Sequence, residues 1–436
     1  MSEVIILLID AATPKCYIEF TLKHTLKRMP MKTDWKKKAV RFIAGQTISL
    51  FGSSLVQYAI MWHITLTTNS GVMMMLSIIC GFLPNFFLSP FAGVWADRFN
   101  RKTLIVLADG VIASVTLLLA ILFMMGINDI WLLFVISAVR SLGTGIQVPA
   151  VNALIPQIVP EDKLTRVNAV NGTIQSVITL VSPMASGALL AVATIDAIFF
   201  VDVFTAAIAI LIMLFFLHVP THEKAAHHQT TGYFSDFKSG LSYIKSHPFV
   251  LKFLTYSGLF SFLVGPAAFL TPLQVTRSFN GDVWHLSAIE IAFSGGMVFG
   301  GLILAAWGGF KNRVHTIILS GFCLSILTVA LGVIPEFWIY LAVMALIGLA
   351  LPLLNTPSTV LLQEKVEESY MGRVFGVFGM IASAVMPLSM LVFGPLSDTV
   401  AIEWLLVITG ILMLVVSVII AGSKTLIKAG EPLKSE

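Results

Sequence analysis

The sequence predicts an all-α integral membrane protein with twelve transmembrane helices in two pseudo-symmetric bundles of six. Hydrophobic residues make up 57% of the 436 residues and charged residues only 11%, whereas a soluble globular protein carries about 25% charged residues. Apolar runs long enough to cross a bilayer recur along the chain. In addition, short motifs of the first half reappear in the second half. These observations exclude a soluble domain and predict a duplicated membrane bundle.

The apolar runs set the predicted spans. We expect them at residues 43–66, 72–96, 104–125, 131–154, 167–194, 197–217, 251–275, 288–307, 317–333, 338–362, 374–396 and 402–421. The first six spans belong to an N-terminal bundle over residues 31–217, and the last six to a C-terminal bundle over residues 251–421. Residues 218–250 are predicted to link the bundles, and residues 422–436 to form a tail.

The basic residues predict the orientation. Of the 27 Lys and Arg residues, only Arg277 falls in an outer loop and only Arg140 lies deep within a span. All others lie on one side of the predicted membrane. Because basic loops remain in the cytoplasm, both termini are expected to be cytoplasmic.

Two segments outside the spans carry their own predictions. Residues 1–30 contain an apolar patch that is too short to span, and Met31 begins an ordinary basic start. We hypothesise that Met31 is the true initiator and that residues 1–30 are an extra segment or a loose tail. In the linker, Phe234, Phe237, Leu241 and Ile244 recur at helical spacing. This pattern predicts an amphipathic helix at the membrane interface, with a soluble linker helix as the alternative.

A charged loop between spans 2 and 3 is the most specific motif. Its pattern Gly-x-x-x-Asp-Arg-x-x-Arg-Lys resembles the signature loop of the major facilitator superfamily, and it places five candidate residues: Gly93, Asp97, Arg98, Arg101 and Lys102. The alternative is an ordinary basic loop. We expect Gly93 to admit a neighbouring helix and the basic side chains to orient the loop and to form pairs between helices. Asp97 is expected to accept hydrogen bonds from a helix N-terminus.

The internal repeat suggests where that N-terminus lies. Arg166-Val167-Asn168-Ala169 opens span 5, and Arg373-Val374-Phe375-Gly376 opens span 11 at an offset of 207 residues. Gln147-Val148-Pro149-Ala150 similarly matches Asn355-Thr356-Pro357-Ser358. The repeat makes the start of span 11, near Arg373, the predicted partner of Asp97. The resemblance implies the same contact, and implies that it holds the outward-facing state.

Four ionisable residues within spans are candidates for proton coupling, because charge in hydrocarbon is costly and marks function. They are Asp109, Arg140, Asp202 and Glu290. Arg140 requires a counter-charge, and we rank Asp109 slightly ahead of Asp202 because it lies in the neighbouring span of the same hairpin. Structural hydrogen bonds are the alternative for both acids, and an interfacial position is the alternative for Glu290. Arg140 matches the superfamily's span-4 arginine, which the resemblance links to proton coupling.

Span 5 carries a second family-like motif. Ser182-Pro183-Met184-Ala185-Ser186-Gly187 resembles the Gly-Pro-x-x-Gly-Gly motif of the superfamily's antiporters, with serine in place of two glycines. Small residues allow close helix approach and proline bends a helix. An ordinary proline kink is the alternative for Ser182, Pro183, Ser186 and Gly187.

Nearly all of residues 31 to 425 resemble the macrolide-efflux branch of this superfamily, and the first 30 residues have no counterpart in it. The resemblance lies in Trp35, Ala44-Gly45-Gln46, Gly81-Phe82-Leu83-Pro84, Arg140-Ser141-Leu142-Gly143-Thr144, Gly308-Gly309-Phe310 and Gln363-Glu364-Lys365. It implies a transporter in the bacterial plasma membrane that exports macrolides or other small amphipathic drugs by proton antiport. The alternatives are a transporter of a metabolite or siderophore, and a sensor or scaffold that has lost transport.

The remaining composition limits cofactors and partners. Three cysteines fit no metal or redox motif, and no phosphate-binding loop is present. We therefore expect no cofactor and no metal, with the proton gradient as the energy source. An enzyme is not expected, because no nucleophile–base pair appears. The net charge of +4 reflects topology and not nucleic-acid binding. We expect a monomer in the lipid bilayer; an assisting ATPase is left open.

Overall fold

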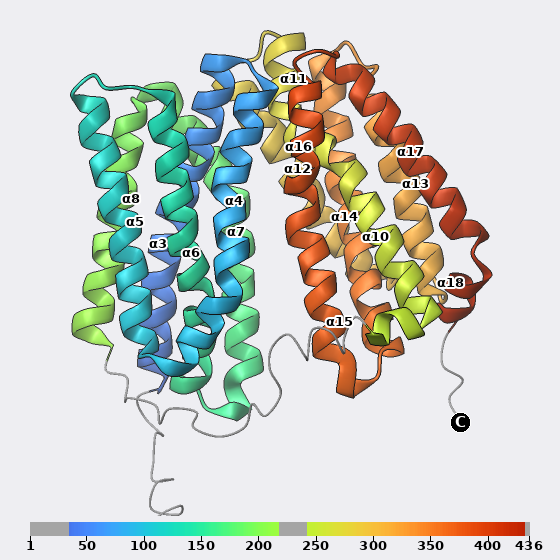
Figure 1. The fold of residues 1–436 in the computed structure, drawn as a ribbon, viewed down its shortest axis with the longest axis horizontal. Coiled ribbons are helices and arrows are strands. Elements are labelled where there is room, and N and C mark those ends of the chain that lie inside the picture. Colours follow the sequence, from blue (N-terminus) through green and yellow to red (C-terminus); the bar gives the residue numbers. More distant parts are fainter. Residues whose placement is uncertain (1–34, 218–241, 432–436) are drawn as a thin grey trace, which may run out of the picture.

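The computed structural model describes residues 35–217 and 242–431, which form two helical bundles standing side by side (Figure 1). The N-terminal bundle consists of α3 (Trp35–Thr68), α4 (Gly71–Arg98), α5 (Arg101–Met124), α6 (Ile130–Ile158), α7 (Leu164–Val192) and α8 (Ile195–Leu211). The C-terminal bundle consists of α10 (Pro248–Phe269), α11 (Thr271–Ser278), α12 (Val283–Trp307), α13 (Arg313–Leu331), α14 (Phe337–Lys365), α15 (Glu368–Met380), α16 (Met386–Leu396) and α17 (Ile402–Gly422). The short α18 (Lys424–Ala429) follows.

The twelve predicted spans are confirmed. Within the two described ranges, 11 helices are long and apolar enough to cross a membrane. The remaining crossing is span 11, which is composite: α15 continues through a π-helical turn, η3 (Ile381–Val385), into α16. A second π-helical turn, η2 (Ile212–Phe216), extends α8. The first helix also begins at Trp35, several residues before the predicted span.

Two predictions fall wholly or mostly outside the described residues. The N-terminal segment 1–30 lies there, as do Phe234, Phe237 and Leu241 of the predicted amphipathic helix. Ile244 is described, and it is buried with Tyr243 in an apolar cluster of the C-terminal bundle. This residue therefore packs against protein and does not face lipid.

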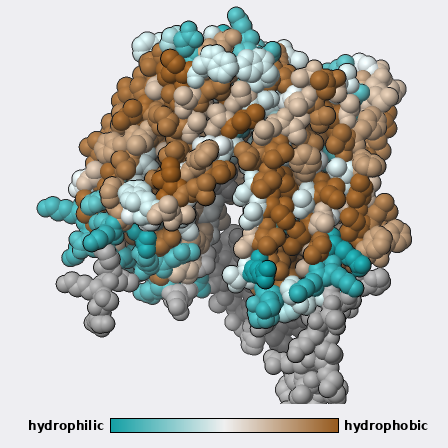
Figure 2. Space-filling view, turned by 180° about the vertical axis from the view of Figure 1, so that it is seen from behind, coloured by the Kyte–Doolittle hydropathy of each residue, from teal (hydrophilic) through white to brown (hydrophobic). Residues whose placement is uncertain are grey.

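The helix ends define two faces. We call one of them the basic face, because Lys102, Lys163, Arg313 and Lys365 lie at the helix ends there. The opposite face carries the connections around Asn69, Arg277 and Asp398. Hydrophilic residues gather along one rim of the molecule and apolar residues cover its sides (Figure 2). An apolar belt between two polar faces is the surface that a bilayer requires.

Glycines set how closely the helices of the C-terminal bundle pack. A Cβ added at Gly296 of α12 would lie 1.9 Å from the backbone oxygen of Ala345 in α14. A Cβ at Gly348 of α14 would lie 2.0 Å from the backbone oxygen of Phe293. Each helix therefore presents a glycine to the backbone of the other, as is common where membrane helices pack without side chains between them.

This packing gives a first prediction. Gly296→Ala should force α12 and α14 apart and destabilise the protein by about 1–3 kcal/mol. The neighbouring Gly295 has open space at its Cβ position, so Gly295→Ala is a matched control that should be neutral. The melting temperatures of the two purified variants in detergent check this. Equal melting temperatures would contradict the assigned close contact.

Candidate functional site

The most extensive contacts between the two bundles are those of α7 with α12 and of α4 with α16, and α3 also contacts α11. The closest approaches lie near the opposite face. A Cβ at Gly187 of α7 would lie 1.7 Å from the Ser287 hydroxyl oxygen of α12. A Cβ at Gly71, at the start of α4, would lie 1.8 Å from the hydroxyl oxygen of Ser397. The bundles are therefore held together at the face opposite the basic face.

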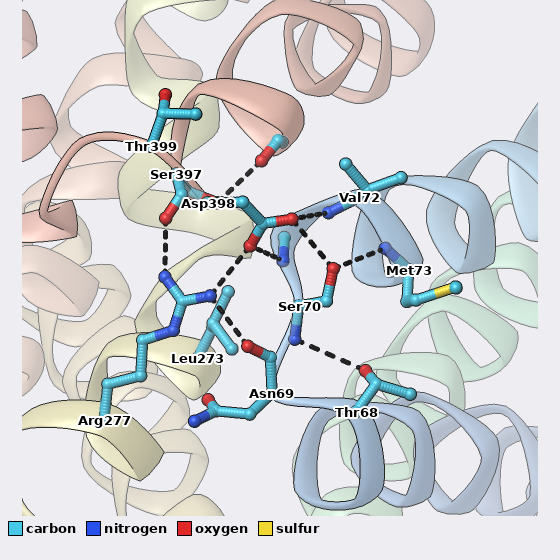
Figure 3. A network of polar contacts seen from close by, with 12 residues as sticks. Thr68, Asn69, Ser70, Val72, Met73, Leu273, Arg277, Ser397, Asp398 and Thr399 are labelled. Carbon is cyan, nitrogen blue, oxygen red and sulfur yellow. Dashed lines mark hydrogen bonds and ion pairs between the residues drawn. The ribbon is translucent and has the colours of Figure 1, made fainter.

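A network around Asp398 joins the bundles at this face (Figure 3). One carboxylate oxygen of Asp398, Oδ1, accepts from the Gly71 amide at 2.6 Å. The other, Oδ2, accepts from the Val72 amide at 3.0 Å and from the Ser70 hydroxyl at 2.8 Å. Because these groups form the N-terminus of α4, the carboxylate meets unpaired amides and the positive end of a helix dipole.

Arg277 of α11 completes the network. Its guanidinium donates to Asp398 at 2.8 Å, to the Ser397 carbonyl at 2.5 Å and to the Asn69 carbonyl at 2.7 Å. We call this set, Asn69, Ser70, Gly71, Val72, Arg277, Ser397 and Asp398, the interbundle latch. Burial favours a higher pKa for Asp398, but the hydrogen bonds from Gly71, Val72, Ser70 and Arg277 outweigh it and hold the pKa below its ordinary value.

Sequence reasoning did not find the latch. Arg277 stood out only as a basic residue in an outer loop, and Asp398 was not singled out. The available signal was weak: an acidic residue just after span 11 and a Ser-Gly pair at the start of span 2. Without the fold, nothing brings these segments together.

The bundles separate toward the basic face. Figure 2 shows them standing apart at their hydrophilic ends. The signature loop lies at this end, and a Cβ at Gly93 would meet no atom within 4 Å. The expectation that Gly93 admits a neighbouring helix is therefore wrong for this conformation, because the bundles are apart at this level.

The basic residues of the signature loop bind within their own bundle. Arg101 donates to the carbonyls of Ala96 and Ala153 at 3.0 and 2.9 Å. Lys102 donates to the carbonyls of Leu214 and Leu217 at 3.2 and 2.8 Å. Cationic side chains at helix C-termini stabilise the exposed carbonyls, so these residues fasten the ends of three helices.

The other residues of the predicted contact between the signature loop and the start of span 11 are only partly described. The side chain of Asp97 lies outside the described part of the chain, and Arg98 is exposed. Arg166 is exposed near the start of α7, and Arg373, its repeat counterpart in α15, lies over the Tyr370 ring at 5.3 Å. The contact between Asp97 and the start of span 11 stays a prediction.

Arg140 forms a buried ion pair, and its partner is Asp202. The guanidinium Nη1 lies 2.5 Å from Asp202 Oδ2, and the two side chains are 6% and 0% exposed. Thr116 bonds both residues. Ser53 donates its hydroxyl to Asp202 at 3.0 Å and accepts from Arg140 through its backbone carbonyl. Every charge in this network is therefore paired.

The ranking of Asp109 ahead of Asp202 as the partner of Arg140 is therefore wrong. Both acids lie on helices that pack near α6, so adjacency in the hairpin does not decide the pairing. Depth in the membrane does: Thr116, which bonds the ion pair, lies seven residues beyond Asp109 in α5, a rise of roughly 10 Å. Asp109 is thus two turns closer to the basic face.

Asp109 is buried in a different environment. Its Oδ1 accepts from Gln147 at 2.5 Å and from the Ser49 hydroxyl at 3.2 Å, and the residue is 1% exposed. Its Oδ2 makes no hydrogen bond of ordinary geometry among the described residues, although the Gln46 amide adjoins the carboxylate. No ion pair to Asp109 occurs in the same part of the chain. Unlike Asp202, this carboxylate is held by neutral groups alone.

Glu290 and the span-5 motif lie at the bundle interface. Glu290 of α12 is close enough to Tyr58 of α3 for its charge to act on the phenol, so it faces the other bundle. In α7, Ser182, Pro183 and Ser186 are buried, and Ser186 donates to the Leu55 carbonyl at 3.0 Å. With the close contact of Gly187, the motif fits α7 tightly between α3 and α12.

The profile of the Major Facilitator Superfamily matches residues 42–390. The chain belongs to the major facilitator superfamily. It is 30% identical over 393 residues to "Macrolide efflux protein A" of Streptococcus pyogenes, covering 90% of this chain and 97% of that protein. It is 32% identical over 323 residues to a protein of the same name from Enterococcus faecalis, covering 73% and 100%. A "Staphyloferrin A transporter" of Staphylococcus aureus is 22% identical over 380 residues, covering 85% and 92%.

Solved structures agree in fold. A D-xylose-proton symporter superposes with a TM-score of 0.67 at 11% identity, covering 91% of this chain and 99% of that one. An inward-facing bacterial homologue of the iron transporter ferroportin gives 0.63 at 14% identity, covering 89% and 99%. The protein is thus a multi-pass membrane transporter of this superfamily, and the bundle interface is where such transporters hold their substrates.

The latch gives a prediction about conformation. Asp398→Asn removes the anion from the α4 N-terminus and from Arg277, a loss of about 1 kcal/mol for a half-exposed charge. The interbundle contact should therefore open about fivefold more often. A Met75→Cys reporter beneath the latch, in a chain with Cys16, Cys80 and Cys323 replaced by serine, should react faster with an impermeant thiol reagent added at the latch face.

The control is Asp282→Asn, which removes an acid that caps α12 within one bundle and should leave reporter labelling unchanged.

The pH dependence of the latch has a defined sign. The latch lowers the pKa of Asp398. The stabilisation of the latched state by the ionised carboxylate is therefore complete above the ordinary pKa of an aspartate, and it is lost as the pH falls through the lowered pKa. The ratio of labelling rates between the Asp398→Asn protein and the protein with Asp398 should therefore be constant from about pH 5 to 8, since the reagent's own dependence on the thiolate is common to both. A latch that loosened within that range would contradict the role of Asp398.

The buried ion pair gives a prediction about stability. Arg140→Ala and Asp202→Ala each leave an uncompensated buried charge, which costs about 3–5 kcal/mol. The double variant leaves neither, so it should be more stable than either single variant. Thermal melting of the three proteins tests this. The half-exposed pair Arg313–Glu364 is the control, because its loss should cost at most about 1 kcal/mol. A double variant that melts lowest would refute the pairing.

Proposed function

We propose that this transporter exports macrolides or related small amphipathic drugs from the bacterial cytoplasm by proton antiport. The observation that carries the proposal is the similarity to macrolide efflux protein A along 97% of that protein's length. The sparse charge within the spans supports it, since an amphipathic cargo requires few fixed charges in its path. We assign a single chain as the working unit, without a cofactor.

The distribution of basic residues supports an orientation in the bacterial plasma membrane. The basic face is cytoplasmic under the positive-inside rule, and both chain ends are then inside. The latch lies on the outer face, so the described conformation is closed outward and open inward. A drug enters between the bundles from the cytoplasm. It leaves after the latch breaks and the basic ends of the bundles close, through the rocking motion typical of such repeats.

Asp109 is the proposed proton carrier. Asp202 is held by Arg140, Ser53 and Thr116, so releasing its charge would leave Arg140 unpaired. Asp109 has one carboxylate oxygen that makes no hydrogen bond of ordinary geometry within the described chain and only neutral donors on the other. Intramembrane carboxylates of this kind form proton relays. Glu290, at the bundle interface, is the next candidate.

The test begins with a drug-sensitive bacterial host. Expression should raise the inhibitory concentration of a macrolide, and an uncoupler should abolish export while ATP depletion with an intact gradient should not. If expression does not raise the inhibitory concentration and no macrolide moves in vesicles, the alternatives are favoured. These are a metabolite or siderophore transporter and a non-transporting sensor. Export driven by ATP without a gradient would instead indicate an assisting ATPase.

Asp109→Asn supplies the residue-level prediction. In proteoliposomes, this variant should lose pH-driven macrolide transport by at least about tenfold while still binding the drug, because only proton exchange requires the carboxylate. Asp162→Asn is the control, since Asp162 is exposed at the basic face beside Lys163. If Asp109→Asn retained full coupling, the proton site would lie elsewhere, with Glu290→Gln as the next variant.

A further inference from the structure

A groove opens on the basic face of the C-terminal bundle, where α12 ends and α13 begins. Its volume is about 510 Å³, and it lies apart from the latch and from the buried acids. The walls are formed by residues 307–311, by the side chains of Arg313 and Glu364, and by Gly430 after α18. Because the helix ends here mark the border between the apolar belt and the polar face, the groove lies at the level of phospholipid headgroups.

The loop that lines the groove has a fixed shape. Gly309 adopts a φ of 79°, in the left-handed region that favours glycine. The Phe310 amide donates to the Thr316 hydroxyl at 2.9 Å, and the Asn312 side-chain amide donates to the Ile427 carbonyl at 2.9 Å. The loop is thereby fastened to α13 and to α18, so the groove is formed before any ligand arrives.

Two cationic side chains in the groove have unused donors. Lys311 is exposed, and its ammonium has no hydrogen-bond or ion-pair partner among residues 35–217 and 242–431. Arg313 donates through Nε and Nη2 to the two carboxylate oxygens of Glu364 at 3.0 and 2.6 Å. A guanidinium carries five N–H donors, and no hydrogen bond to a described residue uses its Nη1 group. With two cations and one acid, the groove attracts an anion.

The signature loop of the N-terminal bundle is the repeat counterpart of this loop, and it has a different charge. The two loops align at an offset of 212 residues through three identical pairs: Trp95 with Trp307, Asn100 with Asn312, and Arg101 with Arg313. In this alignment Gly309 stands where the first loop has Asp97, and Lys311 stands where it has Phe99. The second loop has therefore lost an acid and gained a cation.

An apolar stripe leads from the groove along α12. Phe299, Leu302, Ile303 and Trp307 recur at helical spacing, and their exposed fractions lie between 43% and 64%. The rings of Trp307 and Phe310 pack edge to face with their centroids 4.8 Å apart. Tryptophan is enriched at the headgroup level of membranes. A cationic groove that continues into an apolar stripe matches a phospholipid better than a small free anion, because only a phospholipid has chains to cover the stripe.

We propose that this groove binds the headgroup of an anionic phospholipid, with Lys311 and Arg313 at the phosphate and the acyl chains along the stripe on α12. Basic pockets beside membrane helices on the cytoplasmic side bind such headgroups. Glu364 holds the Arg313 guanidinium in place, so Arg313 presents its free donors in one orientation. The site is independent of the compound that the protein exports.

The test uses purified protein in detergent and a phosphatidylglycerol that carries a photoreactive group in one acyl chain. Peptide mass spectrometry then measures labelling of residues 299–313. Unlabelled phosphatidylglycerol should displace the probe, phosphatidylcholine should require about tenfold more, and inorganic phosphate should not displace it. Lys311→Gln should raise the half-saturating probe concentration about fivefold. Arg313→Gln should raise it at least as much, because it also leaves the Glu364 charge unopposed.

The matched control is Lys163→Gln, which removes an exposed cation from the basic face of the other bundle and should leave labelling of residues 299–313 unchanged. Selective displacement by phosphatidylglycerol, weakened by Lys311→Gln and not by Lys163→Gln, supports the site. Equal displacement by phosphatidylcholine, or unchanged saturation in both groove variants, would overturn the assignment of the headgroup. Displacement by inorganic phosphate as effective as that by phosphatidylglycerol would show a site for a free anion, and the lipid assignment would be wrong.

Discussion

The cost of placing charge in hydrocarbon governs this molecule. An unpaired ion within the membrane costs free energy. Three acids within the described spans differ in how fully their charge is paired. Asp202 is matched to Arg140 and to hydroxyl groups on two other helices, which fixes α3, α5, α6 and α8 relative to one another. Asp109 is bonded only by neutral groups. Glu290 faces Tyr58 across the bundle interface. The rigid pair holds the N-terminal bundle together, and the other two acids are less constrained.

Small residues allow the bundles to meet and part. Gly71, Gly187 and Gly394 bring helices of the two bundles close at one face, and the large side chains of Trp62, Met74 and Ile78 join the apolar cluster of the C-terminal bundle. The latch makes this contact specific, because the Asp398 carboxylate accepts hydrogen bonds from the amides at the N-terminus of α4. Opening this face therefore breaks the charged hydrogen bonds of the latch and also exposes apolar side chains that the two bundles bury together.

Much of the fold followed from the sequence, because membrane spans are encoded by composition over some twenty residues. All twelve crossings were predicted, including the composite span 11. The partner of Arg140 was not predicted correctly. The order of spans along the chain shows which helices are neighbours, whereas the pairing of two side chains depends on their depth in the membrane and on the rotation of each helix. The latch escaped for a related reason: Asp398 and Ser70 are 328 residues apart, and neither belongs to a recognisable motif. The role of Gly93 was misjudged because a motif describes several conformations and the structure shows one.

The π-helical turn in span 11 has a mechanical consequence. A wider turn inside an α-helix is a common place for bending, and η3 divides this span into an upper rod that ends next to Asp398 and a lower rod that begins near Arg373. Ile381, the first residue of the turn, also lines a pocket within the C-terminal bundle. Bending at this turn moves the two rods relative to each other, so the end of span 11 at the basic face can swing while its other end stays attached at the latch.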